Sequence, residues 1–337
     1  MTEPGALMAA EIAEQPFVLQ RLLDEHADAI ADAARTIARH APRFVVLAAR
    51  GTSDNAALYA KYLAEIRMRL PAGLASPSSL TVYGARPDLS GALFVAVSQS
   101  GGSPDLVESL AAARDCGALT VAVTNAPTSQ LATAAEIAID IGAGAERAVA
   151  ATKTYTAELL ALFLLLYGDG ARDLAATVPE AAARTLADPA AQREAGRFRY
   201  ADRLVTTARG YSYPTACEAA LKLMETSYLS AQAFSGADLL HGPVAMVDAS
   251  VPVIAIASRG QGGAAMRPVL DRLDASGADV LRVGAPGGIP LADDGVAEEL
   301  LPILEILPLQ QLAHRVALDR GADPDRPRGL AKVTETR

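Results

Sequence analysis

The sequence of 337 residues contains no tryptophan, two cysteines and four histidines. Two cysteines cannot form a disulfide framework or a cysteine-rich zinc site, so we expect a reducing, cytoplasmic environment. The N-terminal residues include acids where a signal peptide would carry basic residues. The longest apolar run, residues 157–167, is too short to span a bilayer and contains Glu158. We therefore expect no membrane association.

Basic residues are outnumbered by acidic ones, 30 to 39, which gives a formal net charge of −9. This balance argues against a nucleic-acid-binding protein and against binding to anionic membranes. Hydrophobic residues make up 51% of the chain, enough for a substantial core, and global disorder is excluded. A site for an anionic ligand must therefore create its own local positive potential.

Lysine is scarce although arginine is not, because the basic residues include only Lys61, Lys153, Lys222 and Lys332. A coding bias toward arginine is the simplest explanation. Such a chain can nevertheless keep lysine where arginine cannot substitute, since only lysine readily loses its proton to act as a nucleophile or base. The lysines are therefore candidate chemical groups.

Short β-branched runs alternate with helical patterns along the chain. We expect strands in residues 43–51, 80–84, 92–98, 119–125, 136–141, 203–210, 251–258, 278–284 and, in addition, 300–309. We expect helices in residues 1–42, 154–167 and 211–234. Two more helices are expected, one that begins with Ser53 as its cap and one that follows the turn at residues 100–103. This alternation predicts βαβ units and parallel, doubly wound sheets.

The pattern repeats in the second half of the chain. LAARGTSDNAA (47–57) resembles TTARGYSYPTA (206–216), with Ala-Arg-Gly-x-Ser at the same position after a predicted strand. Chance similarity in an alanine-rich sequence is the alternative. We expect an N-terminal helical segment (1–42), a first α/β domain (43–168), a helical connector (169–200), a second α/β domain (201–325) and a C-terminal loop (326–337).

Two hydroxyl-rich turns follow predicted strands in the first domain. They contribute Thr52 and Ser53, and then Ser98, Gln99, Ser100 and Ser103. Pro104 begins the helix after the second turn, where hydroxyls and backbone N–H groups form a neutral anion cradle. The turn is neither a Walker A loop nor GxGxxG, so it suits a phosphomonoester better than a nucleotide. Ordinary helix capping is the alternative for both turns.

The second domain carries the candidate acid–base groups. Glu218, Lys222 and Glu225 are spaced i, i+4, i+7 and so lie on one helix face. A solvent-exposed ion-paired face is the alternative, but the apolar flanks favour a cleft, where a carboxylate beside a lysine can serve as a general base. His241, in the HGP sequence, is a further candidate. The histidines and acids of the sequence do not show the spacing of metal ligands, so we expect neither a metal nor another cofactor.

Several motifs together resemble the sugar isomerase (SIS) family, in collinear order from about residue 43. They are ARGTS, VSQSGGSPDL, AVAATKTYTAELL, CEAALKLMETSYLSAQAF, LLHGP and PRGLAKVTETR. The resemblance is greatest to the isomerase half of glucosamine-6-phosphate synthase and to free-standing type II glucosamine-6-phosphate deaminases. It implies two flavodoxin-like SIS domains in tandem, each a parallel sheet flanked by helices, in a homodimeric enzyme that acts on a hexose 6-phosphate.

The resemblance also implies residue roles. The phosphate-binding positions are matched by Thr52, Ser53, Ser98, Gln99, Ser100 and Ser103. Glu225 matches the base that moves a proton between C1 and C2, and Lys222 matches the lysine that engages the ketose carbonyl. His241 matches a histidine that assists ring opening from the neighbouring subunit, and Lys332 matches the lysine of a C-terminal loop over the sugar. The sugar end is bordered by Arg50, Gly51, Val149, Ala151 and Glu218.

Some positions depart from the family pattern. Thr2 occupies the place of the synthases' cysteine, so we expect no glutaminase domain and no use of glutamine. Arg50 replaces a small thiol, Ala151 replaces a serine, and Gln232 and Asp238 replace glutamates. We expect glucosamine 6-phosphate to yield fructose 6-phosphate and ammonia. The alternatives are an isomerase or dehydratase of N-acetylglucosamine 6-phosphate or another 6-phospho sugar, and a non-catalytic sugar-phosphate sensor.

Overall fold

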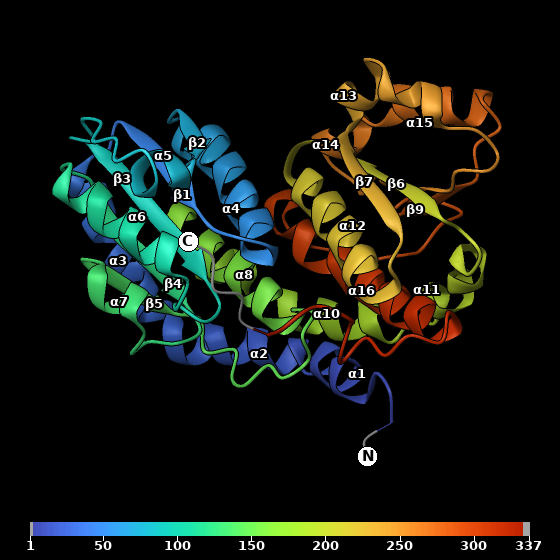
Figure 1. Ribbon diagram of the computed structural model, residues 1–337, viewed down its shortest axis with the longest axis horizontal. Coiled ribbons are helices and arrows are strands. Elements are labelled where there is room, and N and C mark those ends of the chain that lie inside the picture. The colour runs from blue at the N-terminus through green and yellow to red at the C-terminus, as the bar shows by residue number, and fades with distance from the viewer. Residues whose placement is uncertain (1–2, 333–337) are drawn as a thin grey trace. The chain divides into compact units, whose positions relative to one another are not determined.

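The computed structural model describes residues 3–332, which form two compact units, each built on one parallel sheet. The five-stranded unit comprises Phe17–Glu146, Lys153–Ala176 and residues from Ala331 on. The four-stranded unit comprises residues up to Pro16, Arg147–Thr152 and Thr177–Leu330. The predicted N-terminal segment is thus divided at Phe17 and the predicted connector at Thr177. Each unit is assembled from segments that are distant in sequence (Figure 1).

The five-stranded sheet contains β1 (Phe44–Ala48), β2 (Ala72–Leu74), β3 (Ala92–Ser98), β4 (Leu119–Thr124) and β5 (Ile137–Asp140). The strand order is β2-β1-β3-β4-β5, with every neighbouring pair parallel. All residues of β3 and β4 are buried, which explains why their sequences are mostly apolar. The order is flavodoxin-like, and it reverses between β1 and β3, where such sheets bind ligands.

Helices cover both faces of this sheet. The helical elements of the unit are α2 (Gln15–Arg21), η1 (Leu22–His26), α3 (Ala27–His40), α4 (Thr52–Leu63), η2 (Ala64–Met68), α5 (Pro77–Thr81), α6 (Pro104–Asp115), α7 (Gln130–Ala134), α8 (Lys153–Tyr167) and α9 (Ala171–Ala175). α8 packs with α3 and α4, whereas α6 packs with α5 and α7. Every residue of α8 except Tyr167 is buried, so it is the central helix of its layer.

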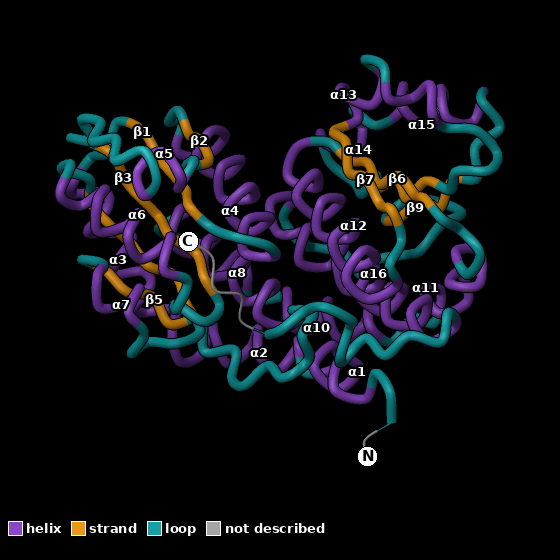
Figure 2. The backbone as a smooth tube through the Cα atoms, viewed as in Figure 1, coloured by secondary structure: helices purple, strands orange, loops and turns teal. Residues whose placement is uncertain are grey.

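The four-stranded sheet contains β6 (Arg203–Ala208), β7 (Ser230–Ser235), β8 (Val253–Ile256) and β9 (Val280–Val283). Its order is β7-β6-β8-β9, again parallel throughout, and it reverses between β6 and β8. Figure 2 shows strands of both units in orange among purple helices. The predicted class, two parallel α/β domains in tandem, is confirmed.

A long helix pair dominates the four-stranded unit. Its helical elements are α1 (Ala6–Ala13), α10 (Val178–Leu186), α11 (Ala190–Glu194), η3 (Ala195–Phe198), η4 (Gly210–Ser212), α12 (Tyr213–Ser227), α13 (Gly236–Leu240), η5 (Pro243–Met246), α14 (Gln261–Ala264), α15 (Arg267–Ala275), η6 (Glu298–Leu300) and α16 (Leu301–Asp319). α16 packs against α12 and also against α1, α10 and α11. Leu239 of α13 and Val269 of α15 join Val205 and Val253 in a separate apolar cluster.

Residues 80–84 do not form the predicted strand. α5 ends at Thr81, and Val82 and Tyr83 are 66% and 83% exposed, whereas a strand in the sheet would bury one of them. Pro77 begins the helix, a position that suits its fixed φ. The strand lies instead at β2, whose sequence Ala-Gly-Leu carries no apolar run that could have predicted it.

The prediction of a strand at residues 300–309 is also wrong, because these residues begin α16. All of residues 301–310 are buried, so the helix has no polar face in this stretch. The sequence therefore lacks the helical spacing of apolar and polar residues that would predict a helix. The predicted helix 211–234 is too long. It ends at Ser227, Tyr228 takes a left-handed conformation with φ 57°, and Ser230–Ser235 form β7.

The first helix of the four-stranded unit is capped from the other end of the chain. The Asp325 carboxylate, buried to 4% exposure, accepts hydrogen bonds from Leu7 N at 2.9 Å and Met8 N at 2.8 Å. Asp323 Oδ1 accepts from Gly5 N at 3.1 Å. These acids satisfy N–H groups that a helix start leaves without partners.

We expect Asp325→Ala to lower the free energy of unfolding by about 1–2 kcal/mol, because two N–H groups of the α1 start lose their acceptor. Urea denaturation of the full chain at neutral pH measures the effect. Asp271→Ala, at an exposed position on α15, is the matched control and should change stability by less than about 0.5 kcal/mol. Equal losses in the two variants would contradict the capping role.

Candidate active site

The first predicted turn connects β1 to α4. Gly51 precedes the helix with φ 57°, and no atom lies within 4 Å of the position that a Cβ would occupy, so the turn is open there. The prediction that Ser53 caps α4 is wrong, because its Oγ donates instead to Glu158 Oε1 on α8 at 2.8 Å. Ser53 can therefore offer an anion its backbone N–H, while its hydroxyl holds the turn on α8.

The second predicted turn connects β3 to α6. Ser98 Oγ accepts from Gly101 N at 3.2 Å, and Ser100 Oγ accepts from Gly102 N at 3.3 Å. Because both oxygens act as acceptors, each hydroxyl keeps its own proton for donation to a ligand. Ser103 precedes α6 without a side-chain capping bond. Helix capping therefore does not account for these hydroxyls.

The two turns lie at the carboxyl ends of neighbouring strands, as predicted, because β1 pairs directly with β3. An ion pair also connects them: Arg50 Nη2 lies 2.7 Å from Oδ2 of Asp105, in the first turn of α6. The Asp105 side chain is 5% exposed and that of Arg50 is 46% exposed. Burial raises the pKa of Asp54 above its usual value, and Arg50 opposes that rise. Arg50 is thus balanced by one acid at each turn, Asp54 on α4 and Asp105 on α6.

The predicted acid–base trio on α12 is assembled in the four-stranded unit. Lys222 Nζ lies 3.3 Å from Glu218 Oε1 and 2.6 Å from Glu225 Oε2. The side chains of Lys222 and Glu218 are 1% and 0% exposed, whereas that of Glu225 is 23% exposed. The alternative of a solvent-exposed ion-paired face is therefore excluded, and Glu225 is the member of the trio that reaches the surface.

The charge state of Lys222 follows from its partners. Burial alone would lower the pKa of its ammonium, but the negative charges of Glu218 and Glu225 outweigh burial and raise that pKa above its usual range. The two carboxylates therefore favour the protonated form of Lys222, which donates a hydrogen bond to Glu225.

Two further predicted residues, His241 and Lys332, lie outside helices and strands. His241 follows α13, is exposed, and its Nδ1 lies 2.7 Å from Ala237 O. A carbonyl only accepts, so Nδ1 carries the proton and Nε2 is the basic nitrogen of the neutral ring. Lys332 Nζ lies 3.0 Å from Glu146 Oε2 in the five-stranded unit. Val149 and Ala151 are partly exposed in the loop before α8. Thr2 and residues 333–337 lie outside the described residues.

The structure also reveals buried acids that sequence reasoning missed. Ser212 Oγ donates to Glu305 Oε1 on α16 at 2.8 Å, which reproduces the pairing of Ser53 with Glu158 on α8. Both serines belong to the repeated Ala-Arg-Gly-x-Ser sequence, the one signal that could have pointed to them. The internal similarity is therefore structural, and it extends to a hydrogen bond between serine and a buried glutamate.

The repeats differ in their second turns. In the four-stranded unit, a Cβ on Gly262 would lie 2.8 Å from Arg209 O, and one on Gly263 would lie 1.6 Å from Ser258 O. Glu298 Oε1 also accepts from Gly262 N at 2.8 Å. In the five-stranded unit, a Cβ on Gly101 would clash with the Ser129 side chain, but one on Gly102 would meet only Ser100 Oγ, at 3.9 Å. The turn of the first repeat is thus open at Gly102, whereas its counterpart is filled by the protein's own atoms.

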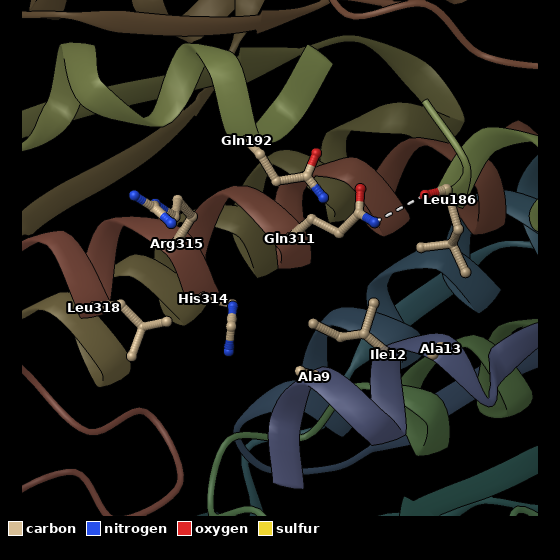
Figure 3. A pocket seen from close by; sticks show the side chains of 9 residues that line it. All are labelled: Ala9, Ile12, Ala13, Leu186, Gln192, Gln311, His314, Arg315 and Leu318. Atoms are coloured by element: carbon tan, nitrogen blue, oxygen red, sulfur yellow. Dashed lines mark hydrogen bonds between the residues drawn. The ribbon is translucent and has the colours of Figure 1, made fainter. Parts of the chain in front are cut away.

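A cavity of about 320 Å³ lies elsewhere in the four-stranded unit, among α1, α10, α11 and α16 (Figure 3). Its lining includes Ile12, Leu186 and His314 but none of the predicted site residues. Within residues 3–332, no three His, Cys, Asp or Glu side chains gather as metal ligands, and no helix is both long and apolar enough to cross a membrane.

Comparison with known proteins agrees with this architecture. The SIS domain model matches residues 39–168 and 197–281. The "glutamine--fructose-6-phosphate aminotransferase [isomerizing]" of Methanothermobacter thermautotrophicus is 34% identical over 98% of this chain and 58% of its own length. The protein of the same name from Thermus thermophilus is 35% identical over 96% of this chain and 58% of its own. The chain therefore spans somewhat more than half the length of these relatives.

Solved structures show the same fold. A candidate phosphosugar isomerase from Silicibacter pomeroyi DSS-3 has a TM-score of 0.86 and 36% identity, covering 94% of this chain and 99% of that one. The glucosamine-6-phosphate deaminase of Thermotoga maritima has a TM-score of 0.79 over 98% of this chain and 100% of that one. Its 22% identity makes it evidence for the fold alone.

Burial raises the pKa of Glu305 from 4.5 to about 7, against the hydrogen bond from Ser212, which lowers it. The native protein therefore binds this proton more tightly than the unfolded chain does. The resulting stabilisation is present in full below about pH 4.5 and is lost as the pH rises to about 7. The rise in pKa from 4.5 to about 7 corresponds to about 3 kcal/mol in the free energy of unfolding.

We expect Glu305→Gln, which cannot ionise, to flatten this part of the pH dependence of the unfolding free energy between pH 4.5 and 7. The variant should exceed the wild type in stability at pH 8 by up to about 3 kcal/mol. Denaturant unfolding at a series of pH values provides the measurement. Glu180→Gln, at an exposed position on α10, should keep the wild-type profile. An unchanged slope in Glu305→Gln would show that the carboxyl is ionised in the native state.

Proposed function

This chain belongs to the SIS domain family and is an enzyme, and we propose that it converts glucosamine 6-phosphate and water into fructose 6-phosphate and ammonia. The observation that carries the proposal is the buried Glu218–Lys222–Glu225 trio, in which Glu225 alone reaches the surface. Aldose–ketose isomerisation needs one base that reaches the substrate and a fixed charge that holds it.

The relatives support the substrate class. The two aminotransferases are named for fructose 6-phosphate and for isomerisation, and they match almost the whole of this chain. A candidate phosphosugar isomerase at 36% identity points to the same class. Removal of the amino group from glucosamine 6-phosphate is the reverse of its addition to fructose 6-phosphate, so one set of acid–base groups serves both directions.

The proposed substrate phosphate binds at the turns of the five-stranded unit. Backbone N–H groups at the start of α4 and α6, together with the hydroxyls of Ser100 and Ser103, donate to its oxygens. Hydroxyls and N–H dipoles provide the positive potential that the net charge of the chain does not. Thr52, Ser98 and Gln99 complete the predicted set.

Proton transfer is assigned to Glu225. Its carboxylate removes the proton from C2 of the open-chain amino sugar and returns it to C1, while a second proton passes from the C2 amine to the C1 oxygen. The C1 aldehyde and C2 amine thereby become a C1 alcohol and a C2 imine. Water then hydrolyses the imine, and ammonia leaves. Lys222 fixes the Glu225 carboxylate and places positive charge beside the oxygen that becomes negative in the transition state.

His241 is assigned to ring opening. Nδ1 is committed to Ala237 O, so Nε2 can take a proton from one sugar oxygen and return it to another. We propose that this histidine serves the site of a second copy in a homodimer, as the family resemblance implies. Lys332 is assigned to the segment that covers the sugar.

Purified protein should release equimolar ammonia and fructose 6-phosphate from glucosamine 6-phosphate, because both products come from one imine. An enzymatic ammonia assay and a ketose assay measure them. N-acetylglucosamine 6-phosphate and unsubstituted hexose 6-phosphates complete the panel. Isomerisation or loss of water confined to those sugars would replace the deaminase proposal, and ligand-induced thermal stabilisation without any turnover would identify a sensor.

We expect Glu225→Gln to lower kcat by about 10²–10⁴-fold, because the base is lost while the amide keeps nearly the same shape. Binding of fructose 6-phosphate, followed by calorimetry, should change less than about threefold. Exchange of the C2 proton with deuterated solvent should fall in parallel with kcat. Glu180→Gln is again the matched surface control. An active Glu225→Gln enzyme would overturn the assignment of the base.

A further inference from the structure

Glu146 is a buried acid outside the predicted site. It lies between β5 and α8, and its side chain is 0% exposed. Oε1 accepts from Thr154 N at 3.2 Å, and Oε2 accepts from Thr154 Oγ1 at 2.6 Å. Thr154 belongs to the first turn of α8, so the carboxylate lies at the positive end of that helix.

The carboxylate also pairs with the C-terminal segment. Lys332 Nζ lies 3.0 Å from Oε2, the oxygen that already accepts from the Thr154 hydroxyl. The Lys332 side chain is only 24% exposed. A buried carboxylate is unfavourable without compensating charge and hydrogen bonds. The Lys332 ammonium therefore stabilises this carboxylate more than it would in a solvent-exposed ion pair.

The residues before Lys332 are also held in place. Arg328 N donates to Tyr228 OH at 2.9 Å, and the Arg328 guanidinium lies 4.2 Å from the centre of the Tyr228 ring. Asp325, three residues earlier, caps α1. Residues 325, 328 and 332 thus each make a specific contact, and the pairing of Lys332 with Glu146 is the last of these along the described chain.

We propose that Glu146 is a positioning residue that holds the C-terminal segment, residues 326–332, through Lys332. Its kinetic consequence rests on the proposed function, in which Lys332 belongs to the segment that covers the sugar. Loss of the Glu146 charge then weakens substrate binding although Glu146 itself touches no substrate.

The substitution Glu146→Gln separates this role from helix capping. Glutamine has one acceptor oxygen, which can still accept from Thr154 N. The NH2 group that replaces the second carboxylate oxygen is only a donor, so it cannot accept from the Lys332 ammonium. The α8 start therefore keeps an acceptor, while the lysine loses its partner. Lys332→Met removes the same pair from the other side and leaves Glu146 in place.

Limited trypsin digestion of the native full chain measures the hold on the segment directly. Cleavage of the Arg328–Gly329 bond, followed by mass spectrometry, should be at least about tenfold faster in Glu146→Gln than in the wild type. Lys332→Met should show a similar increase, and the double variant no further increase, since both remove one interaction. Glu180→Gln should be cut at the wild-type rate. A wild-type rate in Glu146→Gln would overturn the proposal.

Kinetics with glucosamine 6-phosphate supply the second measurement. We expect KM to rise about tenfold in Glu146→Gln and in Lys332→Met, with the two effects non-additive. A lower unfolding midpoint in Glu146→Gln without faster cleavage or a higher KM would show a purely structural role and overturn the proposal. Absence of turnover in the wild type would overturn the proposed function instead, and the digestion experiment would still decide the role of Glu146.

Discussion

The structure depends most on how it accommodates a buried positive charge on α12. Lys222 is stable in the interior only because Glu218 and Glu225 lie within 3.3 and 2.6 Å of its ammonium. Satisfying that charge also determines where Glu225 lies, since an acid in ion contact with a buried lysine cannot rotate freely. The ion pair between Lys222 and Glu225 therefore both stabilises α12 and positions the proposed base. In this structure the two carboxylates hold the Lys222 ammonium from both sides.

The two repeats show how one architecture supports two tasks. Each has a parallel sheet whose order reverses beside its first strand, and each joins the serine of Ala-Arg-Gly-x-Ser to a buried glutamate at 2.8 Å. The second turn of the first repeat is open at Gly102, whereas close glycine packing and Glu298 fill the corresponding turn of the second repeat. In the second repeat, the proposed acid–base groups lie on α12 instead. The proposed phosphate-binding groups thus lie on a turn in the first copy of the fold, whereas the proposed acid–base groups lie on a helix in the second.

Sequence reasoning succeeded where a residue's own neighbours determine its structure. Apolar runs such as β3, the glycine and proline of the second turn, and the i, i+4, i+7 spacing on α12 are local signals, and the structure contains each of them. It failed where burial is complete or partners are remote. Residues 301–310 of α16 show no helical period because every one of them is buried. Glu146 and Glu305 were missed because their partners lie 186 and 93 residues away.

The capping of α1 by Asp325 orders the assembly of the chain in time. The partners are separated by 317 and 318 residues, so α1 is synthesised early and receives its cap only when translation has nearly reached the end of the described chain. Contacts of such high sequence separation carry a large loop-closure entropy and form late in folding. The four-stranded unit therefore becomes complete only with its last segment. A chain interrupted before residue 325 would leave the first N–H groups of α1 without this acceptor.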